Sequence, residues 1–157
     1  MSHDRILIVD FGSQVTQLIA RRVREAGVYC EIHPCTKPIA ELKAFGAKGV
    51  ILSGGPASVH QGGSPTIDKD IFQWGVPILG ICYGEQLICE RLGGRVTPSD
   101  HREFGRAEIE VVADSELTRG LWKPGEHHQV WMSHGDRVDA LPAGFNVIAR
   151  TPSAPYA

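Results

Sequence analysis

The chain has 157 residues, of which 42% are hydrophobic and 22% charged, and a formal net charge of −2 at pH 7. This length suits one domain with a proper hydrophobic core. The nearly neutral charge and the lack of a basic block argue against nucleic acid or a membrane surface as a partner. The apolar runs are strand-sized and no signal-peptide pattern opens the chain, so we expect a cytoplasmic protein without a membrane span.

The first half of the chain alternates between strand and helix patterns. Apolar runs predict buried strands at residues 5–10, 28–33 and 48–53, and helical spacing predicts helices at residues 14–26 and 39–45. Ser13 is expected to cap the first of these helices. This order predicts an α/β fold with a doubly wound, mostly parallel sheet that has helices on both faces, of the flavodoxin-like type.

Three strand ends carry glycine or polar residues, namely Asp10-Phe-Gly-Ser, Ser53-Gly-Gly-Pro and Cys82-Tyr-Gly. Functional residues of such sheets lie beyond the carboxyl ends of the strands, so we expect these three ends to converge. The Gly54-Gly55 pair lets the backbone approach a ligand and can direct N–H groups toward a developing negative charge. From spacing alone, an oxyanion-binding role and a plain turn are equally good interpretations.

The stretch Gly80-Ile-Cys82-Tyr-Gly84 has the form of a nucleophile elbow, with cysteine where hydrolases more often have serine. Flanking glycines are needed where a strand turns sharply into a helix and holds the nucleophile in a strained conformation. The first turn of a helix also favours thiolate over thiol. A buried structural cysteine is the alternative, but that alternative gives the two glycines no use.

The pattern changes in the last third of the chain, where a small antiparallel extension is predicted. Short strands are expected at residues 108–112, 129–133 and 146–150, with a helical turn at residues 117–122. The predicted strand at residues 129–133 is followed directly by His134, with Asp136 close by. A thiolate nucleophile needs a histidine to shuttle protons, and by spacing His134 is the best candidate, although a loop histidine without that role fits equally.

The other cysteines favour no metal site. Cys30, His33 and Cys35 are metal-ligating residue types at close spacing. Along a strand, however, Cys30 and His33 would point to opposite faces, and no fourth ligand lies at a recognised zinc spacing. We therefore predict no metal in this chain. We also expect its cysteines to be reduced, because none forms a Cys-x-x-Cys pair.

Four stretches in order resemble the class I (triad) glutamine amidotransferases, and among their branches the amidotransferase domains of bacterial GMP synthetases. They are residues 10–14 (DFGSQ), 51–56 (ILSGGP), 80–86 (GICYGEQ) and 130–136 (VWMSHGD). Tyr83 and the Trp-Met-Ser-His-Gly-Asp string favour this branch over the anthranilate, carbamoyl-phosphate and CTP relatives. Glu85 departs from the pattern, since methionine or histidine is common there.

The resemblance implies that Cys82 attacks the side-chain amide of glutamine and forms a thioester with release of ammonia. The backbone amides of Gly55 and Tyr83 would hold the oxyanion. The residues implied to line the glutamine pocket are Gln86, Ser133, His134, Gly135 and Asp136. On this view His134 binds substrate and is not the base.

The resemblance also implies a partner, an ATP-pyrophosphatase (synthetase) domain or subunit that binds ATP and Mg²⁺, adenylylates XMP and uses the ammonia to make GMP. The amidotransferase domain itself needs no cofactor, and a homo-oligomer could form through the synthetase part. The family draws its catalytic histidine and glutamate from a His-Pro-Glu motif on a later strand, and residues 1–157 contain no His-Pro-Glu. We therefore interpret residues 1–157 as an amidotransferase domain cut before that strand and lacking the synthetase domain.

Such a chain is expected to have little glutaminase activity by itself, because its thiol lacks a proton shuttle. Two alternatives remain from the sequence. One is a non-catalytic, amidotransferase-like module that binds glutamine or docks on a synthetase. The other is a cysteine hydrolase that acts on another substrate with the same fold.

Overall fold

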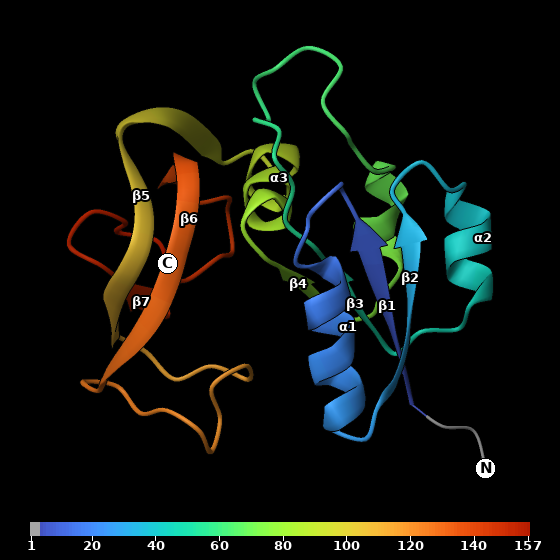
Figure 1. Cartoon of the computed structure of the whole chain (residues 1–157), viewed down its shortest axis with the longest axis horizontal. Helices are drawn as coiled ribbons and strands as arrows, with labels where there is room; N and C mark the ends of the chain where they lie inside the picture. Colours follow the sequence, from blue (N-terminus) through green and yellow to red (C-terminus); the bar gives the residue numbers. More distant parts are fainter. Residues whose placement is uncertain (1–3) are drawn as a thin grey trace. The chain divides into compact units, whose positions relative to one another are not determined.

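The computed structural model describes residues 4–157, apart from the side chains of residues 99–103 and 134. The chain divides into two compact units, Met1–Ile88 and Cys89–Ala157 (Figure 1). The first unit contains β1 (Arg5–Asp10), α1 (Thr16–Glu25), β2 (Tyr29–Pro34), α2 (Ile39–Ala44), β3 (Gly49–Leu52), the 3₁₀ helix η1 (Lys69–Gln73), β4 (Ile78–Gly80) and most of α3 (Tyr83–Arg91). The last turn of α3 belongs to the second unit. The remaining elements are β5 (Arg95–Val111), β6 (His127–Ala140) and β7 (Ala149–Arg150).

The first unit is built on a parallel sheet with the strand order β2-β1-β3-β4. Side chains alternate between the two faces of β1, because successive residues of a strand point in opposite directions. Leu7 and Val9 pack with Leu42 of α2 and Leu87 of α3 on one face, whereas Ile8 packs with residues of α1 and β2 on the other. Helices therefore cover both faces of the sheet, which confirms the predicted doubly wound arrangement.

The predicted elements of the first unit all form, and their ends differ by a few residues. Helix α1 begins at Thr16, and its N-cap residue is Val15, which makes no side-chain capping bond. Ser13 is therefore not the cap, contrary to expectation. Its Oγ instead accepts a hydrogen bond from the amide of Val15 at 3.1 Å, so the serine stabilises the turn before the helix.

The second unit is an antiparallel sheet with the strand order β6-β5-β7. An antiparallel extension was predicted, but β5 and β6 are much longer than expected, at 17 and 14 residues. Pro98 and Gly105 favour strand breaks in the sequence, yet both lie within β5. Pro98 is tolerated because that end of β5 pairs with β6 alone, and the register shifts between Pro98 and Glu103.

One further expectation for this unit was wrong. The backbone of residues 134–136 does not follow a strand end, because β6 continues through it to Ala140. Residues 117–122 form the expected helical turn, in which the backbone amides of Leu121 and Trp122 donate to the carbonyl of Thr118 at 2.9 and 3.0 Å. Within residues 4–157, the longest helix has ten residues, and none is long and apolar enough to cross a bilayer.

Candidate active site

Cys82 lies between the end of β4 at Gly80 and the start of α3 at Tyr83. Its φ is 55°, and it is the one non-glycine residue with a positive φ among residues 4–157. A left-handed backbone is costly for a residue with a Cβ and persists where the surrounding structure enforces it. The observed turn is thus the strained strand-to-helix connection predicted from the sequence.

The two glycines around Cys82 are required by close packing. A Cβ on Gly80 would lie 2.7 Å from the backbone nitrogen of Glu85, and a Cβ on Gly84 would overlap the carbonyl of Leu52. Real Cβ atoms do not approach backbone atoms this closely, so an alanine at either position would push α3 away from the sheet. The glycines let the helix start directly against β3 and β4.

The Gly54–Gly55 turn faces the cysteine. A Cβ on Gly54 would lie 3.5 Å from both the Cβ of Cys82 and the Oγ of Ser13, and a Cβ on Gly55 would lie 2.7 Å from the carbonyl oxygen of Phe11. The turn is therefore held between the end of β1 and the start of α3. The predicted convergence of the three strand ends is confirmed.

The thiol of Cys82 is half-buried. Burial raises its pKa above the usual value, a hydrogen bond from the backbone amide of Tyr83 opposes this rise, and the charge of Glu85 adds to it. The pKa of Cys82 is therefore raised, contrary to the expectation that the helix start would favour thiolate, because loss of hydration outweighs the hydrogen bond from the Tyr83 amide. The same contact shows that the Tyr83 amide, one of the two expected oxyanion donors, is directed at the sulfur.

Tyr83 and Gln86 are fixed beside the cysteine on α3. The ring of Tyr83 is buried, with its centroid 5.5 Å from that of Phe11, and its hydroxyl donates to the carbonyl of Pro65. The backbone amide of Gln86 donates to the backbone carbonyl of Cys82 at 3.1 Å. The side chain of Gln86 is buried as well. These contacts give the first turn of α3 a defined position relative to the sulfur.

Glu85 has an electrostatic role that was not expected from the sequence pattern. Loss of hydration around its carboxyl raises the pKa of Glu85 to about 7, although by surface area the residue is exposed. Its charge is one of the two causes that raise the pKa of Cys82. The sequence marked Glu85 only as a departure from the family pattern, without a consequence for the thiol.

A second feature beyond the predicted site is a buried polar cluster of Asp10, Thr16 and Ser53. The hydroxyl of Thr16 donates to Asp10 Oδ1 at 2.8 Å and lies 3.2 Å from Ser53 Oγ. Ser53 is fully buried and Thr16 is 3% exposed. Asp10 and Ser53 were recognisable as strand ends, but Thr16 belongs to the helix between them and carried no signal.

The remaining predicted pocket residues lie in the second unit, on β6. Ser133 is an exposed residue opposite Phe104 of β5, and Asp136 pairs with Pro98. Gly135 is between them in the strand, and the side chain of His134 lies outside the described part of the structure. Their assignment to a glutamine pocket stays a prediction.

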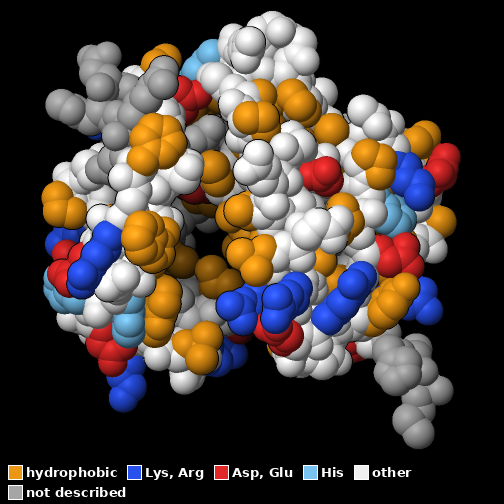
Figure 2. Space-filling model, viewed as in Figure 1, with side chains coloured by type: hydrophobic (Ala, Val, Ile, Leu, Met, Phe, Trp, Pro, Cys, Tyr) orange, Lys and Arg blue, Asp and Glu red, His pale blue; other side chains and the backbone are white. Residues whose placement is uncertain are grey.

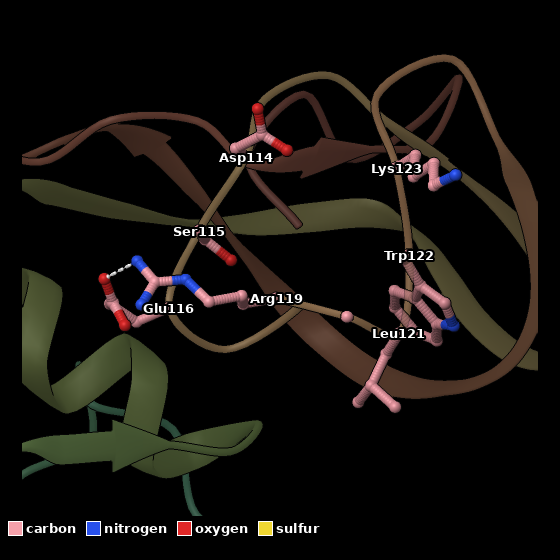
Figure 3. Close-up of a pocket in the computed structure, with 8 residues that line it drawn as sticks. Asp114, Ser115, Glu116, Arg119, Leu121, Trp122 and Lys123 are labelled. Carbon is pink, nitrogen blue, oxygen red and sulfur yellow. Dashed lines mark hydrogen bonds and ion pairs between the residues drawn. The ribbon is translucent and has the colours of Figure 1, made fainter.

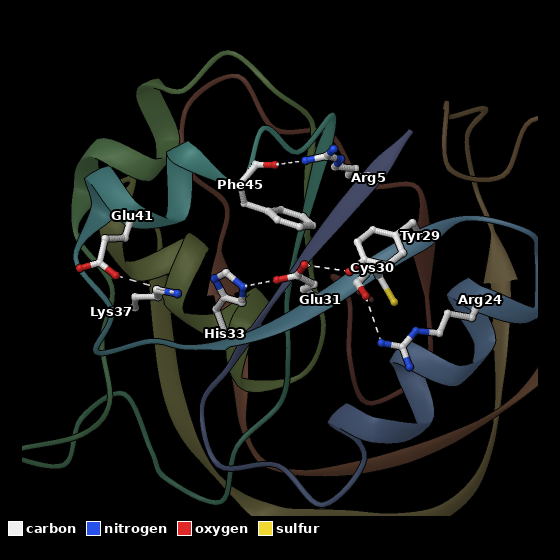
Figure 4. Close-up of polar contacts among 9 residues, drawn as sticks. All are labelled: Arg5, Arg24, Tyr29, Cys30, Glu31, His33, Lys37, Glu41 and Phe45. Carbon is white, nitrogen blue, oxygen red and sulfur yellow. Dashed lines mark hydrogen bonds and ion pairs between the residues drawn. The ribbon is translucent and has the colours of Figure 1, made fainter. Parts of the chain in front are cut away.

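Cys30 and His33 lie on opposite faces of β2, as predicted. The thiol of Cys30 donates to the carbonyl of Ala20 at 3.4 Å. His33 Nε2 lies 2.8 Å from Glu31 Oε2, and its ring centroid lies 5.6 Å from that of Phe45 (Figure 4). Both side chains thus have ordinary structural partners.

The second unit contains an open hollow of about 730 Å³ next to the turn after β5 (Figure 3). It is lined by Asp114, Ser115, Glu116, Arg119, Gly120, Leu121, Trp122 and Lys123. Glu116 and Arg119 pair with each other, and Leu121 is 77% exposed. The hollow contains no residue of the predicted site.

Comparison with known proteins assigns the family. The profile described as "Glutamine amidotransferase class-I" matches residues 7–155. The chain belongs to the class I glutamine amidotransferase family. The structure of a protein from Thermoplasma acidophilum, named as one subunit of a GMP synthase, superimposes with a TM-score of 0.79 and 31% identity, covering 99% of this chain and 77% of that one.

This amidotransferase chain is also similar to two longer proteins, each named "GMP synthase [glutamine-hydrolyzing]". The protein from Bradyrhizobium sp. (strain ORS 278) is 60% identical over 155 residues, and that from Phenylobacterium zucineum (strain HLK1) is 61% identical over 155 residues. The matches cover 99% of this chain but 29% and 30% of those proteins. The chain therefore spans a little under a third of the length of these relatives.

Proposed function

We propose that this domain hydrolyses glutamine for a GMP synthetase and supplies the ammonia that converts adenylylated XMP to GMP. The observation that carries the proposal is the left-handed Cys82 at the strand-to-helix turn, facing the Gly54–Gly55 turn. The 60–61% identity to glutamine-hydrolysing GMP synthases supports this branch of the family. In the whole protein, ATP and Mg²⁺ would be bound by a synthetase part that receives the ammonia.

In the proposed reaction, the sulfur of Cys82 attacks the carbonyl carbon of the glutamine side chain. The tetrahedral oxyanion accepts hydrogen bonds from the amides of Tyr83 and Gly55, and a donor of this kind is generally worth ~3 kcal/mol. The C–N bond then breaks, ammonia leaves with an added proton, and water hydrolyses the thioester to glutamate. Gln86 and residues 133–136 would hold the substrate.

The proton of the thiol needs an acceptor. Because burial raises the pKa of Cys82, the resting group is the thiol, and attack requires a base. Residues 1–157 contain no His-Pro-Glu, the motif from which the family draws this base. We therefore expect residues 1–157 alone to hydrolyse glutamine poorly, and rapid hydrolysis by this chain would make His134 the candidate base.

A covalent probe tests the nucleophile without turnover. The chloroketone 6-chloro-5-oxo-L-norleucine resembles glutamine and has its ketone carbonyl at C5, the position of the amide carbonyl in glutamine. The sulfur adds to the carbonyl carbon, which places negative charge on the carbonyl oxygen, and then moves to the neighbouring carbon as the C–Cl bond breaks and the ketone re-forms. Chloride is released and the thiol proton passes to the buffer. We expect mass spectrometry to find the adduct on Cys82, with protection by L-glutamine but not by D-glutamine.

Matched variants give this test its controls. Cys82→Ala should take up no label, and Cys35→Ser, which changes another partly exposed cysteine of the same unit, should be labelled like the native chain. Absence of labelling at Cys82 would favour the non-catalytic module. Labelling without protection by glutamine would favour a hydrolase of another substrate.

The synthetase assignment is tested in the protein that contains both parts. There, Cys82→Ala should abolish GMP formation from glutamine and leave GMP formation from added ammonia intact. Loss of both activities, or of neither, would contradict the proposal.

A further inference from the structure

The buried hydroxyl of Ser53 is bonded to the turn that faces Cys82. Its Oγ donates to the carbonyl oxygen of Gly54 at 3.1 Å, and Ser53 has no exposed surface. The same oxygen lies 3.4 Å from the amide of Phe11, which donates to it. A serine hydroxyl at the end of β3 thus holds both neighbouring strand ends.

This hydrogen bond fixes the orientation of the next amide. The carbonyl of Gly54 and the N–H of Gly55 belong to one planar trans peptide, so they point in opposite directions. Glycine backbones rotate easily, and neither residue of the pair has a side chain to hold this peptide. Within the turn packed against Phe11 and Cys82, the Ser53 hydroxyl therefore supplies the hydrogen bond that orients the Gly55 amide.

The hydroxyl of Ser53 is itself bonded to Thr16, which is in turn bonded to the carboxylate of Asp10. The Thr16 hydroxyl donates one hydrogen in a three-centre bond, mainly to Asp10 Oδ1 at 2.8 Å and more weakly to Ser53 Oγ, since bonds to charged acceptors are the stronger ones. Asp10 Oδ1 also accepts from the amide of Gly12 at 3.1 Å. The Thr16 oxygen lies 3.2 Å from Ser53 Oγ, so Thr16 connects the end of β1 to the serine.

We propose that Ser53, held by Thr16 and Asp10, is a positioning residue that aims the Gly55 amide at the oxyanion formed by attack of Cys82. The proposal rests on the glutaminase function proposed above. Ser53 does not touch the substrate and acts through the Gly54–Gly55 peptide. Removing its hydroxyl should leave the thiol unchanged and remove the hydrogen bond that orients that peptide.

The test compares two alkylating agents on the purified chain. The chloroketone needs an oriented oxyanion donor, because negative charge develops on its carbonyl oxygen, whereas iodoacetamide reports the intrinsic reactivity of the thiol. For Ser53→Ala we expect the maximal rate of chloroketone labelling to fall at least about tenfold, as for loss of an oxyanion donor. Its half-saturating concentration and the iodoacetamide rate at Cys82 should stay at the native values.

Thr16 supplies a matched pair of variants. Thr16→Val keeps the shape of the side chain and removes the hydroxyl, so its chloroketone rate should fall severalfold, while Thr16→Ser keeps the hydroxyl and should retain the native rate. Thr118→Val removes another buried hydroxyl, one that contacts Ser115 in the second unit, and should be labelled at the native rate. If Ser53→Ala does not fold, the Thr16 pair decides.

The outcomes separate the two proposals. If the native chain is not labelled at Cys82, the glutaminase function fails, and the positioning role fails with it. If the native chain is labelled but Ser53→Ala and Thr16→Val react at the native rate with a lowered melting temperature, the cluster is structural and only the positioning role is overturned. A parallel fall in the iodoacetamide rate would also overturn it, since the thiol itself would then be affected.

Discussion

The two units of the chain differ in where their glycine and polar residues lie. In the first unit these residues are packed tightly at the carboxyl ends of the strands, where Gly84 touches β3 and the fully buried Ser53 bonds to Gly54. In the second unit, the β5–β6 hairpin presents large side chains to solvent, with Phe104 67% and Trp131 75% exposed. The first unit therefore has the close packing expected of a reaction site, whereas the second is a hairpin with hydrophobic side chains exposed on one face.

The exposed face follows from strand register. Phe104 lies opposite Ser133, and Arg106 lies opposite Trp131, so the two aromatic residues share one face of the hairpin. Figure 2 shows hydrophobic side chains on the surface over β5 and β6. Replacement of a single group near Cys82 should therefore change the reactivity of the thiol, whereas the outer face of the hairpin should tolerate substitution.

The largest effect is expected from a comparison of Cys82, which precedes α3, with Cys89, which lies within it. Cys82→Ala should reduce glutamine-dependent turnover of the whole protein by ~10³-fold or more, because the proposed nucleophile is lost. Cys89 lies in the second unit, where its thiol donates to the carbonyl of Ala140 at 3.3 Å. Cys89→Ala should keep the activity and lose ~1–2 kcal/mol of stability, measured by denaturant unfolding. Equal losses of activity would contradict the division of roles.

The next effect concerns the glycines of the elbow. In Gly84→Ala, the new methyl group would overlap the Leu52 carbonyl, so we expect a loss of ~1–3 kcal/mol of stability and of chloroketone labelling. Gly62 is the control, because a Cβ there meets no atom within 4 Å. Gly62→Ala should change stability by less than ~0.5 kcal/mol. Native labelling of a folded Gly84→Ala chain would show that the close packing is dispensable.

How much the sequence predicted depends on how local each signal is. The elbow was recognisable because Gly80 and Gly84 bracket Cys82 within five residues, and the strands of the first unit because their apolar runs are continuous. The length of β5 was missed because Pro98 and Gly105 favour breaks, while its pairing partners in β6 lie far along the chain. Strand pairing of this kind leaves little trace in a short window.

The prediction that the Cys82 thiol ionises easily failed for the same reason, because ionisation depends on residues distant in the sequence. A helix start predicts an easily ionised thiol, but burial depends on residues distant in sequence, and burial determines the direction of the pKa shift. The Ser53 hydrogen bond was also missed, since a serine before two glycines is typical of an ordinary turn. The turn that carries Cys82 was predictable from sequence, whereas the burial of its thiol and the hydrogen bonds around it were not.

A smaller effect is expected from Glu85. Above pH 7 its carboxylate is negative and raises the pKa of Cys82. Glu85→Gln removes that charge, so the thiolate fraction at pH 8 should rise, and iodoacetamide should modify Cys82 about two- to threefold faster. Below pH 6 both proteins carry a neutral side chain at this position and should react alike.

Two further measurements check the role of Glu85. Glu90→Gln changes an exposed carboxylate farther along α3 and should leave the alkylation rate of Cys82 unchanged. Because the pKa of Glu85 is raised from 4.5 to about 7 in the folded chain, folding favours its protonated form, and this contribution to stability declines between pH 4.5 and 7. Glu85→Gln should reduce that decline, and an unaltered pH profile of both stability and alkylation would contradict the assignment.

The smallest effect is expected on the exposed face of the second unit. Trp131→Thr replaces a side chain that is already 75% exposed with a residue that suits a strand, so the free energy of unfolding should change by less than about 0.5 kcal/mol. Ile109, on β5 of the same hairpin, is 7% exposed, and Ile109→Ala should cost ~2–5 kcal/mol. Denaturant unfolding of the two variants measures the contrast directly. A loss for Trp131→Thr as large as that for Ile109→Ala would mean that the outer face is part of the folding core. The contrast drawn between the two units would then be wrong.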